Sequence, residues 1–275
     1  MTLPPALSHA IIAFTVLNAL LVLVAYVTLL ERKFAARMQS RIGPYYVGRP
    51  HGWLQPIADA LKLMMKEDIV PTASDRWVYN LAPLVFLMPC LLIFATIPFA
   101  PELGVADLNI GVLFFLAVSS LEIVGLFMGG WGSNNKYALL SAMRAVNQII
   151  SYDLPFVFAA LVSGPAGGLA ADVGDRDRAA GAVVRGLPGH RPARASCAFL
   201  VATLAAENRV PFDILEAESE LVAGFRVEYS GMKFALIQLG EYAHMLGTSF
   251  LGALLFLGGW LGPGPAWLGP LVVPR

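Results

Sequence analysis

The 275 residues carry little charge, since only 14% are Asp, Glu, Lys or Arg and 57% are hydrophobic; soluble proteins have roughly 25% charged residues. The 19 basic residues cancel the 19 acidic ones, and this balance excludes the excess of Lys and Arg that is typical of a nucleic-acid-binding protein. Cys90 and Cys197 are the only cysteines, which excludes a disulfide framework, a thiolate metal motif and iron–sulfur ligation by this chain.

Apolar segments recur along the chain, and a helix needs about 20 apolar residues to cross roughly 30 Å of hydrocarbon. The candidate spans are residues 10–30, 78–100, 110–131, 139–162 and 232–261, with a short apolar segment at 195–206 that cannot span alone. Three prolines in the second span predict a bend there. The sequence therefore predicts an all-α fold, a polytopic bundle of transmembrane helices in a single membrane domain.

The distribution of basic residues predicts the topology of the bundle. The first apolar run lacks a basic segment before it and ends in charges, so it is expected to be a membrane helix and not a cleaved signal peptide. Eight Lys and Arg residues lie between Glu31 and Arg76, and none lies between Pro101 and Asn109. Basic loops stay in the cytoplasm, so we expect the N-terminus to lie outside.

An Arg-rich stretch at 164–195 breaks this pattern. If successive predicted spans cross the membrane in alternate directions, residues 172–194 lie outside. They nevertheless contain five arginines, which the positive-inside rule disfavours there. Their composition has neither a helical nor a strand period, which predicts an irregular loop. Each arginine at the bilayer centre would cost roughly 2.5–3.5 kcal/mol, so a full span drawn from this stretch is disfavoured.

Residues 53–66 have the pattern of an amphipathic helix. Apolar residues recur at helical spacing, Pro56 is tolerated in the first turn, and polar residues, Asp59 and Lys62 among them, share the opposite face. Two interpretations stay open. The helix lies in the membrane interface as an anchor, or it forms one wall of a cavity for an amphipathic ligand.

Residues 207–231 form an acidic cytoplasmic loop between the last two apolar segments. Six carboxylates accompany Arg209 and Arg226; they are Glu207, Asp213, Glu216, Glu218, Glu220 and Glu228. Crowded carboxylates favour proton exchange near neutral pH. The alternative is a solvated loop that docks a basic partner.

Three acids and a histidine lie inside the predicted spans, namely Glu122, Asp153, Glu241 and His244, in addition to the basic residues Arg144 and Lys233. Ionisable groups in the membrane are costly and therefore suggest function. Glu241 and His244, three residues apart, share a helix face and could exchange a proton, neutralise each other or serve the structure alone. A metal site is disfavoured, because His244 has no second His or Cys at ligand spacing.

Long motifs in the chain resemble those of a known family. They are LLERKFAARMQSRIGPYYVGRPHGWLQPIADALKLMMKED from Leu29, MRAVNQIISYD from Met143, ENRVPFDILEAESELVAGFRVEYSGMKFALIQLGEYAHM from Glu207, and FLGGW ending at Trp260. Together they resemble the H-subunit family of NADH:quinone oxidoreductase, the family of membrane proteins that enclose the quinone chamber of respiratory complex I.

The resemblance implies a multi-pass protein of the bacterial inner membrane that belongs to an NADH:quinone oxidoreductase translocase and is not catalytic alone. Quinone, either ubiquinone or menaquinone, would be the substrate, with no covalently bound cofactor, and flavin and iron–sulfur clusters would reside in partner subunits. The residues implied to line or guard the quinone chamber are Glu31, Arg32, Arg41, Asp59, Lys62, Phe225 and Arg226. Those implied in a proton path are Glu122, Asp153, Asp213, Glu216, Glu218, Glu220 and Glu241.

The chain departs from the family at a few positions. Ala206 stands where the family usually has Glu, and Glu207 follows one residue later. One residue rotates a helical side chain by about 100°, which leaves open whether Glu207 points into the path. Asp153 stands where Glu is common, and the chain stops before the family's last two helices.

Two other functions share some of these features. A membrane component of an energy-converting hydrogenase would pass electrons to protons instead of quinone, but the complete 207–245 motif disfavours it. An ion transporter would use the same buried carboxylates, but it would be expected to carry inverted repeats, and none is evident in the sequence.

Overall fold

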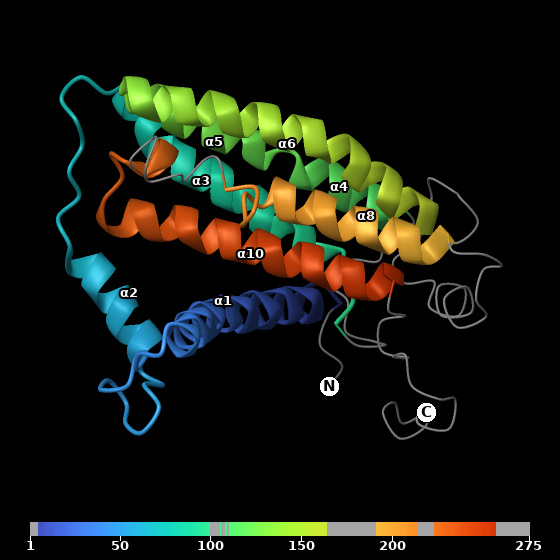
Figure 1. Ribbon diagram of the computed structural model, residues 1–275, viewed down its shortest axis with the longest axis horizontal. Coiled ribbons are helices and arrows are strands. Elements are labelled where there is room, and N and C mark those ends of the chain that lie inside the picture. The colour runs from blue at the N-terminus through green and yellow to red at the C-terminus, as the bar shows by residue number, and fades with distance from the viewer. Residues whose placement is uncertain are drawn as a thin grey trace.

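The computed structural model describes residues 5–99, 105, 108, 110–163, 191–213 and 223–256, with only the backbone for 5–10, 162–163 and 191–194. Every element in these residues is a helix, which confirms the predicted all-α fold (Figure 1). The α-helices are α1 (Pro5–Met38), α2 (Gln55–Met65), α3 (Arg76–Leu92), α4 (Gly111–Ser119), α5 (Glu122–Gly132), α6 (Lys136–Ser163), α8 (Arg191–Ala206) and α10 (Gly231–Phe256). Two short 3₁₀ helices are η1 (Ile93–Ala95) and η3 (Gly224–Arg226).

Three helical segments are long and apolar enough to cross a membrane: Ile11–Met38, Arg76–Ala95 and Gly111–Gly132. Their 28, 20 and 22 residues extend about 42, 30 and 33 Å at 1.5 Å per residue, which matches a hydrocarbon core of about 30 Å. The chain is thus membrane-embedded. Helices α6 and α10 have comparable length, with 28 and 26 residues, and the spans expected at 139–162 and 232–261 stay predictions.

The third of these segments is interrupted inside the bundle. The sequence predicts one continuous span over 110–131, but α4 ends at Ser119 and α5 begins at Glu122. The Leu121 N–H bonds the Val118 carbonyl at 3.0 Å, three residues back, and the Ser120 hydroxyl donates to the Ala117 carbonyl at 3.0 Å. The break places Glu122 in the first turn of a helix, where the helix dipole favours a negative charge.

The expected boundaries of two other segments also shift. The span predicted over 78–100 is helical as α3 only to Leu92, beyond Pro83 and Pro89, and continues as the 3₁₀ helix η1. Helix α8 begins at Arg191, so the prediction of irregular structure through Arg194 is wrong for its last four residues. Pro192, the second helical residue, fits because the first turn of a helix has no intrahelical use for its N–H. Residues 164–190 of the Arg-rich stretch lie outside the described residues.

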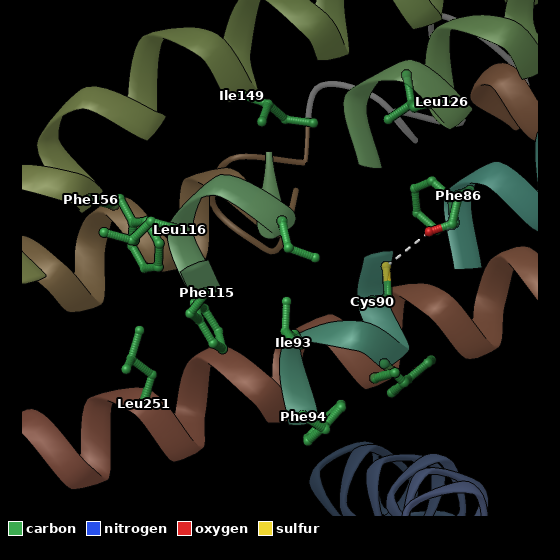
Figure 2. Close-up of a cluster of buried hydrophobic side chains, with 14 of the residues drawn as sticks. Phe86, Cys90, Ile93, Phe94, Phe115, Leu116, Leu126, Ile149, Phe156 and Leu251 are labelled. Carbon is green, nitrogen blue, oxygen red and sulfur yellow. Dashed lines mark hydrogen bonds between the residues drawn. The ribbon is translucent and has the colours of Figure 1, made fainter. Parts of the chain in front are cut away.

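The bundle centres on α3, which packs between α5 and α10, while α6 runs along α5 and α8 (Figure 1). Figure 2 shows how the core is filled: Ile93 and Phe94 of η1 lie on the side of Phe115 of α4 and Leu251 of α10, and Phe86 of α3 lies on the side of Leu126 of α5. A Cβ on Gly125 would lie 2.4 Å from the Phe86 nitrogen. Only glycine therefore allows α5 to approach α3 this closely, as small residues do in membrane bundles.

Helices α1 and α2 lie at the edge of the bundle, below α10 in Figure 1. Only 17% of the apolar window of α1 is buried within the chain, and Phe14 and Phe34 are each 70% exposed. Helix α2, which lies within the predicted 53–66 range, has no buried residue. The apolar surfaces of both helices are thus available to lipid, to partner proteins or to an amphipathic ligand.

Candidate functional site

A polar cavity of about 130 Å³ lies inside the bundle. Its lining comes from α3, α5, α6 and α10 and from the segments that follow α8; the ionisable lining residues are Glu122, Glu207, Arg209, Asp213, Arg226, Glu241, Tyr242 and His244. At roughly 30 Å³ per molecule, the cavity has room for about four waters. Asn208 also lines it, and the side-chain oxygen of Asn208 is buried without a hydrogen-bond partner among the described residues. A cavity of this size and polarity can conduct protons between its acidic groups through water.

Glu31, Arg209 and Tyr242 join α1 to the cavity. Arg209 bonds a Glu31 oxygen at 3.0 Å, and the Tyr242 hydroxyl donates to the other Glu31 oxygen at 2.5 Å. The Arg209 guanidinium also stacks over the Tyr242 ring, 4.7 Å from its centroid. Burial alone would lower the pKa of Arg209, but the Tyr242 hydroxyl and the Glu31 charge raise it above its usual value. Arg209 is therefore a permanent cation at this position.

The turn that ends α8 aims Arg209 at its partners. Asn208 has φ +50°, and the Arg209 N–H bonds the Leu204 carbonyl at 3.1 Å. Asparagine tolerates this left-handed conformation better than most residues, and it commonly ends helices in this way. In the third motif, Asn208 thus provides the turn that ends α8, and Arg209 provides the cation that pairs with Glu31.

Phe225 and Arg226 belong to η3, which lies beside α5 and α6. Phe225 is buried, and its ring lies 6.3 Å from the ring of Phe86 in α3. Arg226 bonds a Glu241 oxygen at 2.7 Å, with side-chain exposures of 11% and 24%. This pair joins a residue predicted for the quinone chamber to one predicted for the proton path.

Arg32 and Asp59 connect α1 to α2. Their side chains form an ion pair at 2.6 Å, and Gln55 donates to the second Asp59 oxygen at 3.0 Å. The Lys33 ammonium donates to the His51 carbonyl and so holds the loop between the two helices. The structure therefore brings Arg32 and Asp59 together, as expected for residues that share one site.

The remaining residues of the predicted chamber and path are distributed differently. Arg41 and Lys62 are exposed, and Arg41 donates to Gln39 at 2.7 Å. Asp213 lines the cavity, whereas Asp153 is half-buried on α6 and does not contribute to the lining. Glu216, Glu218 and Glu220 lie outside the described residues.

Glu122, Glu207 and His244 meet at the inner side of the cavity. His244 Nδ1 lies 2.9 Å from Glu207 Oε1 and 3.4 Å from Glu122 Oε2, and the three side chains are 4–6% exposed. Glu207 directly follows α8, its N–H still bonds the Thr203 carbonyl at 2.9 Å as in a continuing helix, and its side chain lines the cavity. The shifted glutamate thus still reaches the cavity.

Sequence reasoning missed four polar residues that hold these groups in place. The Ser119 hydroxyl contacts His244, and the Cys90 thiol contacts Glu122. The Thr248 hydroxyl contacts Glu207, and the Tyr242 hydroxyl contacts Glu31. A single hydroxyl or thiol in an apolar helix gives no periodic signal, since helices accept such groups by bonding them to their own backbone. Only the position of Tyr242, directly after Glu241, could have suggested a role.

Comparison with known proteins identifies the family. The family model described as NADH dehydrogenase matches residues 11–273. This chain belongs to the NADH dehydrogenase family. The resemblance drawn from the motifs is thereby confirmed. Within the first motif Arg32 pairs with Asp59, within the third Arg226 pairs with Glu241, and Tyr242 of the third bonds Glu31 of the first.

Individual relatives agree with this family. The chain is 50% identical over 235 residues to the H subunit of NADH-quinone oxidoreductase from Dehalococcoides mccartyi, covering 85% of this chain and 65% of the relative. It is 45% identical over 269 residues to the corresponding protein of Polaromonas naphthalenivorans, covering 95% and 75%, and 45% identical over 260 residues to that of Geobacillus kaustophilus, covering 91% and 76%. The chain thus spans just under two thirds of the length of the first relative and about three quarters of the other two.

Proposed function

We propose that this chain is the H subunit of a proton-translocating NADH:quinone oxidoreductase. It forms part of a quinone-binding chamber and carries an acidic path that couples quinone reduction to proton translocation. Its partners are the other subunits of the complex, which hold flavin and iron–sulfur clusters and oxidise NADH, together with quinone and the lipid bilayer. Its location is the bacterial inner membrane, with the N-terminus outside.

The observation that carries this proposal is the direct contact between the two predicted sets of residues. Arg226, assigned to the chamber, bonds Glu241, assigned to the path, at 2.7 Å. Glu31, assigned to the chamber, bonds Arg209 and Tyr242, which line the polar cavity. A change of charge in the chamber is thus one ion pair away from the acidic groups of the cavity.

The physical basis of coupling is electrostatic. Two unit charges 4 Å apart interact by about 4 kcal/mol at an effective dielectric constant of 20, four times more than in bulk water. An anionic reduced quinone near Arg226 would compete with Glu241 for the guanidinium. Glu241 would then gain affinity for a proton, and the cavity would supply that proton.

Replacement of Asp59 tests the chamber assignment. The Arg32–Asp59 pair is partly exposed, with side-chain exposures of 53% and 32%, and pairs of this kind contribute only about 0–1 kcal/mol to stability. Asp59→Asn should therefore assemble normally but lower NADH-driven quinone reduction by about tenfold or more, because a misplaced substrate reacts slowly. The measurement is the rate in inside-out membrane vesicles.

Ala60→Ser on the neighbouring exposed position serves as the control and should retain the rate. NADH oxidation by ferricyanide, which requires only the partner subunits, reports assembly. An Asp59→Asn complex that assembles and reduces quinone at the unmodified rate would contradict the assignment. Proton-dependent hydrogen evolution or ion flux without quinone would favour the hydrogenase or transporter alternatives.

A further inference from the structure

His244 lies between two carboxylates that come from different parts of the chain. Its Nδ1 faces Glu207, in the turn after α8, at 2.9 Å and Glu122, at the start of α5, at 3.4 Å. Its Nε2 lies 3.0 Å from the hydroxyl of Ser119, the last residue of α4. We propose that His244 passes a proton from Glu207 to Glu122, with Ser119 as the positioning residue. This step rests on the proposed function of the acidic path and adds an imidazole to it.

The charges around the cluster favour a shared proton. Two buried carboxylates cost several kcal/mol each if they remain charged and unpaired. The arginines that line the same cavity are engaged by other acids, Arg209 by Glu31 and Arg226 by Glu241. The imidazole is the hydrogen-bonded base that both Glu122 and Glu207 contact, so at least one proton is held among the three groups.

Two proton hops give a net transfer of one proton, and the imidazole ends in the protonation state in which it began. His244, protonated on both nitrogens, gives its Nδ1 proton to the Glu122 carboxylate and becomes neutral while Nε2–H donates to Ser119 Oγ. The freed Nδ1 then accepts the proton of the Glu207 carboxylic acid. One proton has moved from Glu207 to Glu122, and the imidazolium is restored. Ser119 keeps the second proton on Nε2, so Nδ1 is the atom that exchanges.

Each packed element presents a further group to the cluster. From α3, the Cys90 thiol lies 3.5 Å from Glu122 Oε2. From α10, the Thr248 hydroxyl donates to Glu207 Oε1 at 3.0 Å, and Glu241 lies one turn before His244. From α6, Asp153 is a further acid within electrostatic range of the imidazole. The thiol and hydroxyl orient the carboxylates, while the acids set how firmly the proton is held.

The position of Glu207 supports this role for His244. The Glu207 N–H bonds the Thr203 carbonyl at 2.9 Å, so Glu207 continues the backbone of α8, and its carboxylate reaches His244 of α10 at 2.9 Å. The same imidazole nitrogen also lies 3.4 Å from Glu122, so it contacts both carboxylates. The two features are thus parts of one arrangement.

Replacement of His244 and Ser119 in the whole complex tests the proposal. The complex is reconstituted in vesicles, and proton uptake driven by NADH and quinone is followed from pH 5.5 to 9. His244→Gln keeps an amide at this position but no exchangeable base, so the rate of proton uptake should fall by about tenfold or more. The plot of the proton-uptake rate against pH should show one ionisation fewer than that of the unmodified complex. Ser119→Ala should slow uptake and shift the profile, and Ser119→Thr should restore both.

Ser151→Ala is the matched control, because the hydroxyl of this exposed residue bonds the Asn147 carbonyl of its own helix, and it should behave like the unmodified complex. An assembled His244→Gln complex with the unmodified rate and pH profile would overturn the proposal. If His244→Gln fails to assemble, Ser119 decides: an unmodified profile in Ser119→Ala overturns the relay, and loss with rescue by threonine supports it. An unmodified complex that pumps no protons would instead contradict the proposed function.

Discussion

The Arg226–Glu241 ion pair is the contact on which coupling depends at the scale of single residues. Both side chains are largely buried, and a buried charge that loses its partner is destabilising. Arg226→Gln should therefore lower the stability of the detergent-solubilised complex by as much as about 3 kcal/mol. The double variant Arg226→Gln with Glu241→Gln should recover part of that loss.

A double-mutant cycle of thermal unfolding measures this pair. A coupling energy of about 1–3 kcal/mol is expected for residues in direct contact. Additive effects of the two substitutions would show that Arg226 and Glu241 do not interact, and they would remove the connection between chamber and cavity.

Single residues also show how far sequence reasoning reaches. Glu122, Glu241 and His244 could be selected from the sequence, because a charged side chain in an apolar run is conspicuous. Their partners could not, since Cys90 and Glu122 are separated by 32 positions and the packing of α3 against α5 brings them together. The contribution of Ser119 depends in the same way on the three-dimensional arrangement.

At the scale of elements, the close approach of α3 and α5 depends on Gly125. Because its added Cβ would lie 2.4 Å from the backbone of Phe86, Gly125→Ala must push the helices apart. Overpacking of this kind costs about 1–3 kcal/mol, so the thermal midpoint of the solubilised complex should fall by about 3 °C or more.

Gly129→Ala on the same helix is the comparison, since its Cβ would first meet the Phe225 side chain, at 3.3 Å. A side chain moves more easily than a backbone, so this variant should lose less stability. Equal midpoints for the two variants would mean that the contact between α3 and α5 is looser than described.

Helix α2 touches α1 and α10, but its apolar face stays largely open, since none of its residues is buried. If this face forms a wall of the quinone chamber, Leu61→Ser removes apolar contact worth about 1.5 kcal/mol or more. The KM for quinone should then rise about tenfold, with Ala60→Ser as the control. An unchanged KM together with weaker retention in the membrane would indicate that α2 is an anchor alone.

The elements themselves were largely predictable, and their interruptions were not. Apolar length predicted helices at α1, α3 and α10, and periodicity predicted α2. The helix break between Ser119 and Glu122 contains neither Gly nor Pro, so the sequence gives no signal for it. It arises from hydroxyl bonds to the backbone and from packing, and it brings Glu122 to a helix start.

At the scale of the whole molecule, the zero net charge is the sum of separate regions. The bases gather before Arg76, and the acids gather after Ala206 and at a few positions in the spans. The fold brings these regions together, because α1 and α2 lie against α10. Two ion pairs join the regions, Arg209–Glu31 and Lys233–Asp68, the latter at 2.7 Å; in both, the acid comes from the N-terminal region and the base from the C-terminal region.

A cryo-EM map of the assembled complex with a bound short-chain quinone tests the central claim most directly. The proposed function predicts density for the head group among α1, α2 and α10, with Arg32, Asp59 and Arg226 at its boundary. A head group in the apolar groove of about 480 Å³ between α8 and α10, which Phe199, Met245 and Phe256 help to line, would contradict it. So would a quinone bound by the partner subunits without contact to this chain.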